Sequence, residues 1–473
     1  MSRVVRITIS LIAIFTWVCN SAIAAAPPTD RTRPNVLLLL TDQQTLRAMS
    51  AYGNRYLHTP HMDSLAAAGV RFGISYCTSP VCGPSRSSIV TGCMPHETGV
   101  DLNGQTPDPA IPNLGQIFRD AGYETAWTGK WHLPGSYPRP PDGTIPGFDC
   151  LHVPEGTRFM LGDQTDAAVT DQAVAFLRKE HDRPWLLAVS LHNPHDICWW
   201  VREKPVKPAN LDLFPPLPDN FAIAPDESEF MTDCRKPKTY GVEQQFTADW
   251  DEIQWRAYLY SYYRLTEQVD RLVGRILDVL REKNLDDNTL IVFTSDHGEG
   301  AAGHQLIVKL TPYDGAAAVP LVIAWNGRIP AGREDQTHPV SSIDIVPTVC
   351  DYAGVTLAKP VTGVSLRPII EDPKAPGRGY AVCELSPFRT QPHRKARVLR
   401  TMQYKYIAFT DGQRPEMLFD MQDDPGESRN LASRAAHRDE LMHHRQLLAQ
   451  WVERTNDHFV APWMTTTEKE NMP

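Results

Sequence analysis

The sequence has fewer basic than acidic residues, with 47 lysines and arginines against 56 aspartates and glutamates. A formal net charge of −9 argues against general binding to nucleic acids, whose phosphates attract basic surfaces. We find no repeat of fixed period, and no cysteines and histidines at the spacing of a structural zinc site. The apolar share of 42% is ordinary for a soluble globular protein.

Hydrophobic runs of about 20 residues, which a membrane-spanning helix needs, are also missing. The longest run, Ile7–Val18, follows Arg3 and Arg6 and precedes the small residues of Ala22-Ile23-Ala24. This order is typical of a signal peptide, and the run is short for a membrane anchor. We therefore predict a signal peptide over residues 1–24 and a periplasmic or secreted protein without stable membrane insertion.

Apolar strands alternate with helices over the first three quarters of the chain. Asn35–Thr41 ends in polar residues, the pattern of a buried parallel strand whose carboxyl end opens into a site. We predict an α/β domain over residues 34–375, with a large, mainly parallel sheet flanked by helices. The expected strands are Asn35–Thr41, Tyr123–Trp127, Trp185–Leu191, Asp287–Ser295 and Val319–Ala324, and the expected helices are His61–Gly69, Ile111–Gly122, most of Ala248–Asn284 and Ser342–Tyr352.

The pattern changes near residue 375. Residues 376–460 are predicted to form a smaller C-terminal α+β subdomain, an antiparallel sheet with one helix. Its expected strands are Tyr380–Glu384, Ala396–Thr401, Lys405–Phe409 and Met417–Asp420, and its helix lies around Glu440–Val452. The proline-rich segment Trp199–Asp249 lacks a clear period and is either a functional loop or surface padding.

The run from Cys82 to Gly92, which begins Cys-Gly-Pro-Ser-Arg, predicts a cysteine just before the start of a helix. Pro84 suits a first helical turn and Gly92 suits the end. The free N–H groups and the dipole at a helix start favour an anion, and Arg86 lies one turn on. A cysteine in this position is activated rather than inert.

The same run resembles the type I sulfatase motif, Cys-x-Pro-Ser-Arg followed by Thr-Gly, and matches each of its fixed positions. The resemblance extends over about residues 34–433 and implies an alkaline phosphatase-like fold. It also implies that a formylglycine-generating maturation enzyme converts Cys82 to formylglycine (3-oxoalanine). That group, once hydrated, would then attack the sulfur of a sulfate ester, so the chain is expected to be a sulfuric ester hydrolase, a sulfatase.

Two segments at strand ends match the metal-binding segments of that family. The resemblance implies that Asp42, Gln43, Asp296, His297 and the residue at position 82 hold a divalent cation, with calcium expected first and magnesium or manganese as alternatives. Most relatives have Asp where this chain has Gln43, and many have Asn where it has His297. These departures lower the negative charge of the site and leave the identity of the metal open.

Further segments resemble the cationic part of the sulfatase site. Lys130 and His132 belong to a Gly-Lys-Trp-His segment and would share a face of an extended chain. His195 follows a Pro-His pattern, with His192 as its rival, and Lys309 matches the second lysine of the family. The resemblance implies that Arg86, Lys130 and Lys309 stabilise the developing anion. It further implies that Lys309 or His195 protonates the leaving group, while Asp296 and His132 accept protons; Lys130, His195 and Lys309 would also bind substrate.

Two other functions remain open from the sequence. The first is a phosphonate monoester or phosphodiester hydrolase of the same superfamily, since some of these carry Gln and His at the positions of Gln43 and His297. The second is a non-catalytic carbohydrate-binding relative with an unmodified Cys82. For a sulfatase, the expected substrates are sulfated carbohydrates or polysaccharide fragments, and intervals 133–190 and 197–286, which match the family least, are expected to determine substrate choice.

Overall fold

The structure of the chain is a computed structural model that describes residues 33–134, 144–151, 161–202, 211–236 and 242–465. The predicted signal peptide lies outside these residues. Within them, no helix combines the length and the apolar character needed to cross a membrane. No disulfide joins the eight cysteines of the described part.

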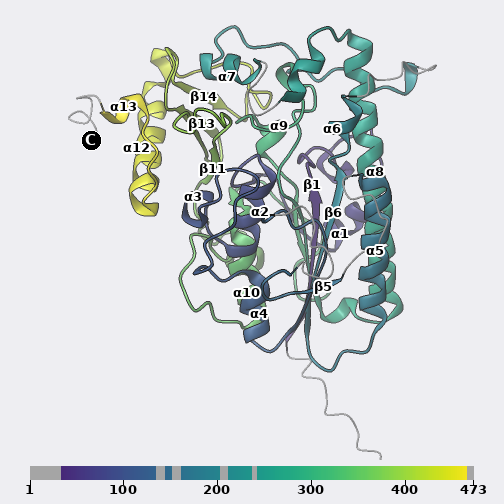
Figure 1. The fold of residues 1–473 in the computed structure, drawn as a ribbon. Coiled ribbons are helices and arrows are strands. Elements are labelled where there is room, and N and C mark those ends of the chain that lie inside the picture. Colours follow the sequence, from purple (N-terminus) through teal and green to yellow (C-terminus); the bar gives the residue numbers. More distant parts are fainter. Residues whose placement is uncertain (1–32, 135–143, 152–160, 203–210, 237–241, 466–473) are drawn as a thin grey trace, which may run out of the picture.

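An eight-stranded sheet forms the centre of the larger part of the molecule (Figure 1). Its order is β5-β4-β6-β1-β7-β8-β2-β9, and the strands from β5 to β7 run parallel. β8 is antiparallel to both neighbours, so the predicted, mainly parallel sheet is confirmed. The strands are β1 (Asn35–Asp42), β2 (Gly69–Phe72), β4 (Glu124–Gly129), β5 (Asp149–Leu151), β6 (Trp185–Pro194), β7 (Thr289–Ser295), β8 (Leu321–Ala324) and β9 (Arg333–Asp335), and β3 (Ser75–Tyr76) and β10 (Val340–Ser341) pair separately.

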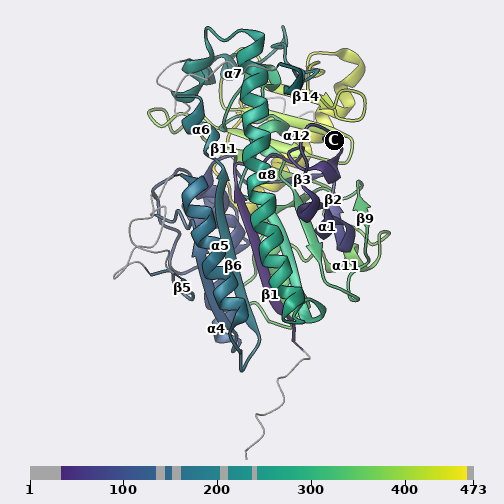
Figure 2. The ribbon, with the colours of Figure 1, turned by 90° about the vertical axis from the view of Figure 1, so that its right-hand side faces the viewer.

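Helices cover both faces of this sheet. Alternate residues of β1 point to opposite faces: Leu37 and Leu39 pack under α1, α5 and α8, and Val36 and Leu38 pack under α2, α4 and α10. Figure 2 shows α5 and α8 side by side over the first face. Each fully buried aliphatic side chain contributes about 1.5–3 kcal/mol, which fixes the register of the strand. The helices of this part are α1 (Pro60–Ala68), α2 (Cys82–Thr91), α3 (Pro95–Thr98), α4 (Leu114–Asp120), α5 (Gly162–Arg178), α6 (Ile197–Trp200), α7 (Glu229–Cys234), α8 (Glu252–Glu282), α9 (Asp314–Ala317), α10 (Ile345–Ala353) and α11 (Arg367–Glu371).

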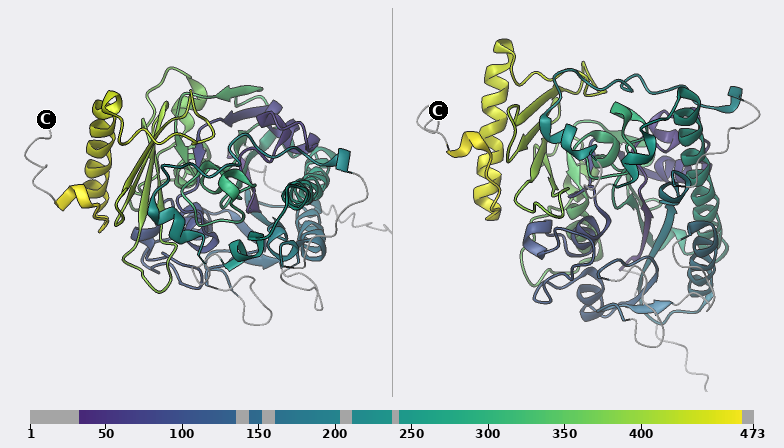
Figure 3. Two further views of the ribbon diagram at one scale, coloured as in Figure 1. Left: turned by 90° about the horizontal axis from the view of Figure 1, so that it is seen from above. Right: turned by 45° about the horizontal axis from the view of Figure 1, so that its top comes forward.

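The C-terminal part contains an antiparallel sheet of order β11-β12-β13-β14, as the sequence predicts. One face packs against the larger part through residues such as Phe230 and Leu306, and the other is covered by α12 through Leu448 and Trp451 (Figure 3). The two parts therefore share a hydrophobic core on one side of this sheet. The elements are β11 (Ala381–Leu385), β12 (Ala396–Arg400), β13 (Tyr404–Phe409), β14 (Glu416–Asp420), α12 (Arg438–Thr455) and α13 (Pro462–Thr465).

Candidate active site

The carboxyl ends of four parallel strands meet at one edge of the large sheet, where ligands bind in open α/β folds. Asp42 ends β1, Lys130 follows β4, His195 follows β6 and Asp296 follows β7. The chain turns at Gly129, whose φ is +92° and where a Cβ would stand 2.0 Å from the carbonyl oxygen of Ser190. Only glycine fits this close approach.

Cys82 is the first residue of α2, one position later in the helix than the sequence analysis placed it, and its side chain is buried. Its Sγ lies 2.9 Å from Lys309 Nζ and 3.1 Å from His297 Nε2. Burial and Asp42 raise the pKa of this thiol, but Lys130, Lys309 and His297 outweigh them and hold the pKa well below its usual value. Position 82 is therefore a site built for an anion.

Arg86 joins the strand ends on one side of Cys82. Its Nε donates to Asp296 Oδ2 at 2.7 Å, its Nη2 to Asp42 Oδ2 at 2.9 Å, and its Nη1 to Ser190 Oγ at 2.9 Å. The guanidinium is buried and committed to these partners. Arg86 thus contributes positive charge to the site while it fixes the two carboxylates in place.

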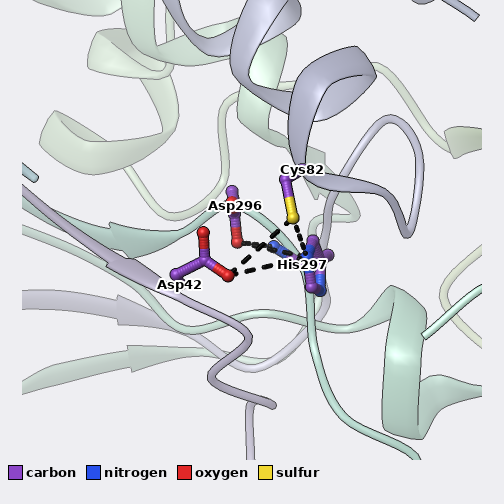
Figure 4. A group of neighbouring side chains, drawn as sticks. All are labelled: Asp42, Cys82, Asp296 and His297. Atoms are coloured by element: carbon purple, nitrogen blue, oxygen red, sulfur yellow. Dashed lines mark hydrogen bonds and ion pairs between the residues drawn. The ribbon is translucent and has the colours of Figure 1, made fainter. Parts of the chain in front are cut away.

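Ligand atoms of Asp42, Cys82, Asp296 and His297 all lie within 4.8 Å of one another (Figure 4). Asp42 uses Oδ2 to accept from Arg86 and from Lys130 Nζ at 2.5 Å, while its Oδ1 faces the cluster. His297 Nδ1 lies 2.8 Å from the Gly298 carbonyl oxygen and donates to it, which directs Nε2 at Cys82. Carboxylate oxygens with an oriented imidazole nitrogen form a donor set that fits a divalent cation.

The two carboxylates differ in proton affinity. Burial raises the pKa of Asp42, but Lys130, His195 and Arg86 more than offset this and hold it well below the usual value. Burial and the charge of Asp42 raise the pKa of Asp296 to about 6. Asp42 is therefore a permanent anion near neutral pH, whereas Asp296 can accept and return a proton.

Gln43 and Lys309 lie on the other side of Cys82. Gln43 has a φ of +67°, and its backbone N–H donates to Asp296 Oδ1 at 3.1 Å. Its Oε1 accepts from Lys309 Nζ at 3.1 Å. Lys309 itself stands between Val308 and Leu310, which have φ values of +56° and +71°, so a strained loop presents the ammonium to the sulfur.

The expected extended geometry of Lys130 and His132 is wrong, because β4 ends at Gly129 and His132 has a φ of +65°. Lys130 Nζ nevertheless lies 4.0 Å from Cys82 Sγ, and His132 is close enough to Cys82 and Lys130 for both to influence its pKa. Burial lowers the pKa of His132. The left-handed turn, rather than a shared strand face, brings this imidazole near Cys82.

Of the two histidines after β6, His195 is the one that reaches the site. Its Nε2 lies 4.0 Å from Asp42 Oδ1, and Cys82 is close enough to influence its pKa. His192 instead directs Nε2 toward Asp196, at 3.9 Å. Burial, Lys130 and Lys309 lower the pKa of His195 to about 4, so its ring is neutral near pH 7.

Three site residues have no motif to reveal them. Asp166 accepts the backbone N–H groups of His192 and Asn193 at 2.6 and 2.8 Å and so holds the end of β6. Glu299 accepts a hydrogen bond from the side chain of Gln43, and Tyr258 donates one to Glu299. Glu299 stands three residues after Asp296 in the sequence, and this spacing is the only local signal for any of them.

The two tryptophans that follow His195 are both partly buried. Trp200 packs with Trp250 and Tyr258 at ring-centroid distances of 6.1 and 6.2 Å. Trp199 is half-buried, with the Arg202 guanidinium 4.7 Å from its ring centroid. A cation of the chain itself therefore lies over one face of the Trp199 ring.

The family model for sulfatases matches residues 34–355 of this chain. The chain belongs to the sulfatase family. A second model, for the C-terminal region of N-sulphoglucosamine sulphohydrolase, matches residues 303–454. Membership predicted from the Cys82 motif is thus confirmed, and the chain is a sulfuric ester hydrolase.

Individual relatives match most of the length of this chain. A Delta 4,5-hexuronate-2-O-sulfatase of Bacteroides thetaiotaomicron is 29% identical and covers 93% of this chain and 92% of its own. A choline-sulfatase of Rhizobium meliloti is 30% identical, over 85% and 82%. The solved structure of a 2-O GAG sulfatase has a TM-score of 0.79 at 28% identity, covering 90% and 93%. That of a phosphonate monoester hydrolase of Agrobacterium radiobacter has a TM-score of 0.73 at 25% identity, covering 89% and 96%.

Proposed function

We propose that this sulfatase is exported and removes sulfate from sulfated carbohydrates, with Cys82 matured to formylglycine as the nucleophile. The carrying observation is the anion site at position 82, where Lys309 Nζ and His297 Nε2 lie 2.9 and 3.1 Å from Sγ. The thiol sulfur stands in for the oxygen that the converted side chain would carry. Stabilisation of an anion at this atom is what a nucleophile needs before it attacks sulfur.

We assign a divalent cation, calcium before magnesium or manganese, to Asp42, Gln43, Asp296, His297 and the residue at position 82. When bound, the cation would supply positive charge and acidify an oxygen beside it. Oxygen donors outnumber nitrogen donors in this set, which supports a hard cation. Asp296, whose pKa is raised to about 6, is suited to take a proton from the nucleophile.

The remaining side chains bind the sulfate group and move protons. Lys130 and Lys309 carry charges close to position 82 and would hold the sulfuryl oxygens as negative charge develops. His132, neutral because burial lowers its pKa, would act as the base that restores the nucleophile. Of the two candidate acids, Lys309 would donate a proton to the leaving oxygen, because its ammonium keeps its proton while the His195 ring is neutral near pH 7; His195 would contact the substrate.

The carbohydrate assignment is supported by the named relatives. They include the hexuronate-2-O-sulfatase, an N-acetylglucosamine-6-O-sulfatase and an ulvan-active sulfatase, each 27–29% identical over about 90% of this chain. We therefore expect a sulfated saccharide as the substrate.

The first test is mass spectrometry of the tryptic peptide Phe72–Arg86, from protein produced with a formylglycine-generating enzyme. We expect the aldehyde or its hydrate at position 82, and then turnover on a panel of sulfated sugars. A thiol at position 82, in a preparation where a control sulfatase is converted, would remove the proposed nucleophile and favour the binding-protein alternative.

A second candidate function is the hydrolysis of phosphonate monoesters. It is suggested by Gln43 and His297 and by the likeness to the phosphonate monoester hydrolase. The ratio of kcat/KM for a sulfate monoester to that for a phosphonate monoester, measured on one preparation, separates the two. We expect sulfate to be preferred. A ratio below one would assign the site to phosphonate esters.

A further inference from the structure

Glu299 is a fully buried carboxylate beside the active site that carries none of the roles assigned above. Its Oε2 accepts from Gln43 Nε2 at 2.6 Å, and its Oε1 accepts from the hydroxyl of Tyr258. Tyr262 lies one turn after Tyr258 on the same face of α8. Its hydroxyl donates to the Gln43 carbonyl oxygen at 2.8 Å. Gln43 is thus held by partners at both its backbone and its side chain.

These contacts permit only one orientation of the Gln43 amide. A lysine ammonium only donates and a carboxylate only accepts. Gln43 Nε2 must therefore face Glu299, and Oε1 must face Lys309 Nζ. The flipped amide would place two acceptors 2.6 Å apart and two donors 3.1 Å apart.

We propose that Glu299, supported by Tyr258, is a positioning residue that directs the Gln43 carbonyl oxygen at Lys309 and at the cation site. The proposal rests on the cation assignment made above for Gln43. It gives a physical reason for glutamine at position 43, since a carboxylate there would face the carboxylate of Glu299.

The proposal predicts how the Gln43 amide responds when Glu299 is replaced. In Glu299→Leu, Gln43 Nε2 loses its carboxylate acceptor and keeps only the weak acceptor Cys198 Sγ at 3.2 Å, so the amide orientation is held less firmly. In Glu299→Gln, the new side-chain carbonyl still accepts from Gln43 Nε2, so the orientation is kept. Partners of metal ligands in proteins affect metal affinity by about 10- to 100-fold.

The test is calorimetric titration of the metal-free protein with calcium, magnesium and manganese, together with kcat and KM at saturating metal. We expect Kd for the preferred cation to rise about 10- to 100-fold in Glu299→Leu and to stay within about threefold of the parent in Glu299→Gln. Tyr258→Phe, which removes one hydroxyl without changing shape, should give an intermediate Kd. Tyr313→Phe is the matched control, because its hydroxyl donates to a different buried carboxylate, Glu227, at 2.8 Å.

Thermal unfolding of each variant distinguishes positioning from general stability. If Glu299→Leu and Tyr258→Phe lower the unfolding midpoint but leave Kd unchanged, Glu299 is structural only and the proposal is overturned. The same follows if Glu299→Gln weakens binding as much as Glu299→Leu does. If the parent protein binds none of the three cations, the cation assignment fails and the positioning proposal fails with it, whereas conversion of Cys82 is decided separately by mass spectrometry.

Discussion

His96 joins the two parts of the molecule through a contact that requires a charged imidazole. It lies on α3, and its Nδ1 and Nε2 stand 2.5 Å from Glu384 Oε1 and 3.0 Å from the carbonyl oxygen of Thr455. Both partner atoms accept, so both ring nitrogens must donate, which only the imidazolium can do. Thr455 ends α12, where the helix dipole also favours a cation.

The surrounding charges agree with this assignment. Burial lowers the pKa of His96, but the hydrogen bond and charge of Glu384, together with Asp457, more than offset this and raise the pKa to about 9. Arg397 also pairs with these acids, with Asp457 at 2.7 Å and with Glu384 at 3.6 Å. The edge of Trp451 closes the remaining side.

The size of the effect follows from linkage. The pKa of an unfolded histidine is about 6.5, and one pKa unit corresponds to about 1.4 kcal/mol, so the contact contributes about 3 kcal/mol. Since the folded-state pKa is the higher one, this stability is complete below about pH 6.5 and is lost as the pH rises through about 9. We expect His96→Gln to be about 3 kcal/mol less stable than the parent at pH 6, and the gap to close by about pH 9.5.

Urea unfolding of both proteins at the two pH values measures the gap directly. Taking the difference between variant and parent removes the titration of all other groups. His458→Gln is the control, because His458 is exposed and close in sequence to Asp457, and its gap should be small and independent of pH. An His96→Gln gap that is equal at both pH values, or that widens at high pH, would refute the imidazolium assignment.

Three further predictions concern the site and the core. Lys309→Ala and His132→Ala should each lower kcat by about 100-fold or more with little change in unfolding midpoint, and full turnover in either would remove that residue from the mechanism. Dialysis against a chelator should abolish sulfate-ester turnover and calcium should restore it; activity that survives complete metal removal, checked by elemental analysis, would count against the cation site. Trp127→Ala should lower the free energy of unfolding in urea by about 3–5 kcal/mol, because this buried ring packs against Trp131 and Phe148 at ring-centroid distances of 5.0 and 5.4 Å. A loss below about 1 kcal/mol would mean that neighbouring side chains fill the cavity.

Most of the strands could be predicted from the sequence because they are buried on both faces. Asn35–Asp42 and Thr289–Ser295 are buried along their whole length, and a continuous apolar run marks such strands. Helix α5 was missed although Val169, Ala173 and Phe176 carry a helical spacing. Its many polar residues mask that spacing, since only a narrow stripe of the helix faces the sheet.

The residues that converge around Cys82 could be selected from the sequence because each stands at the end of a strand or the start of a helix, within a local motif. The orientation of those residues could not. Gln43 is fixed by Glu299 and Tyr258, which lie more than 200 positions away in the sequence. His132 reaches the site through a left-handed turn that the neighbouring residues in the sequence do not predict. Such features depend on tertiary packing, which no local pattern records.

Helix α2 is buried along all ten of its residues, and Cys82 is 1% exposed. No second enzyme can close its own active site around this side chain once the helix has packed between the sheet and α10. Any conversion of Cys82 must therefore compete in time with folding, and a chain that folds first would be stable, correctly shaped and permanently inactive. The specific activity of a preparation would then measure a race between two rates, and slowing the folding of the chain, rather than stabilising its native state, would be the way to raise it.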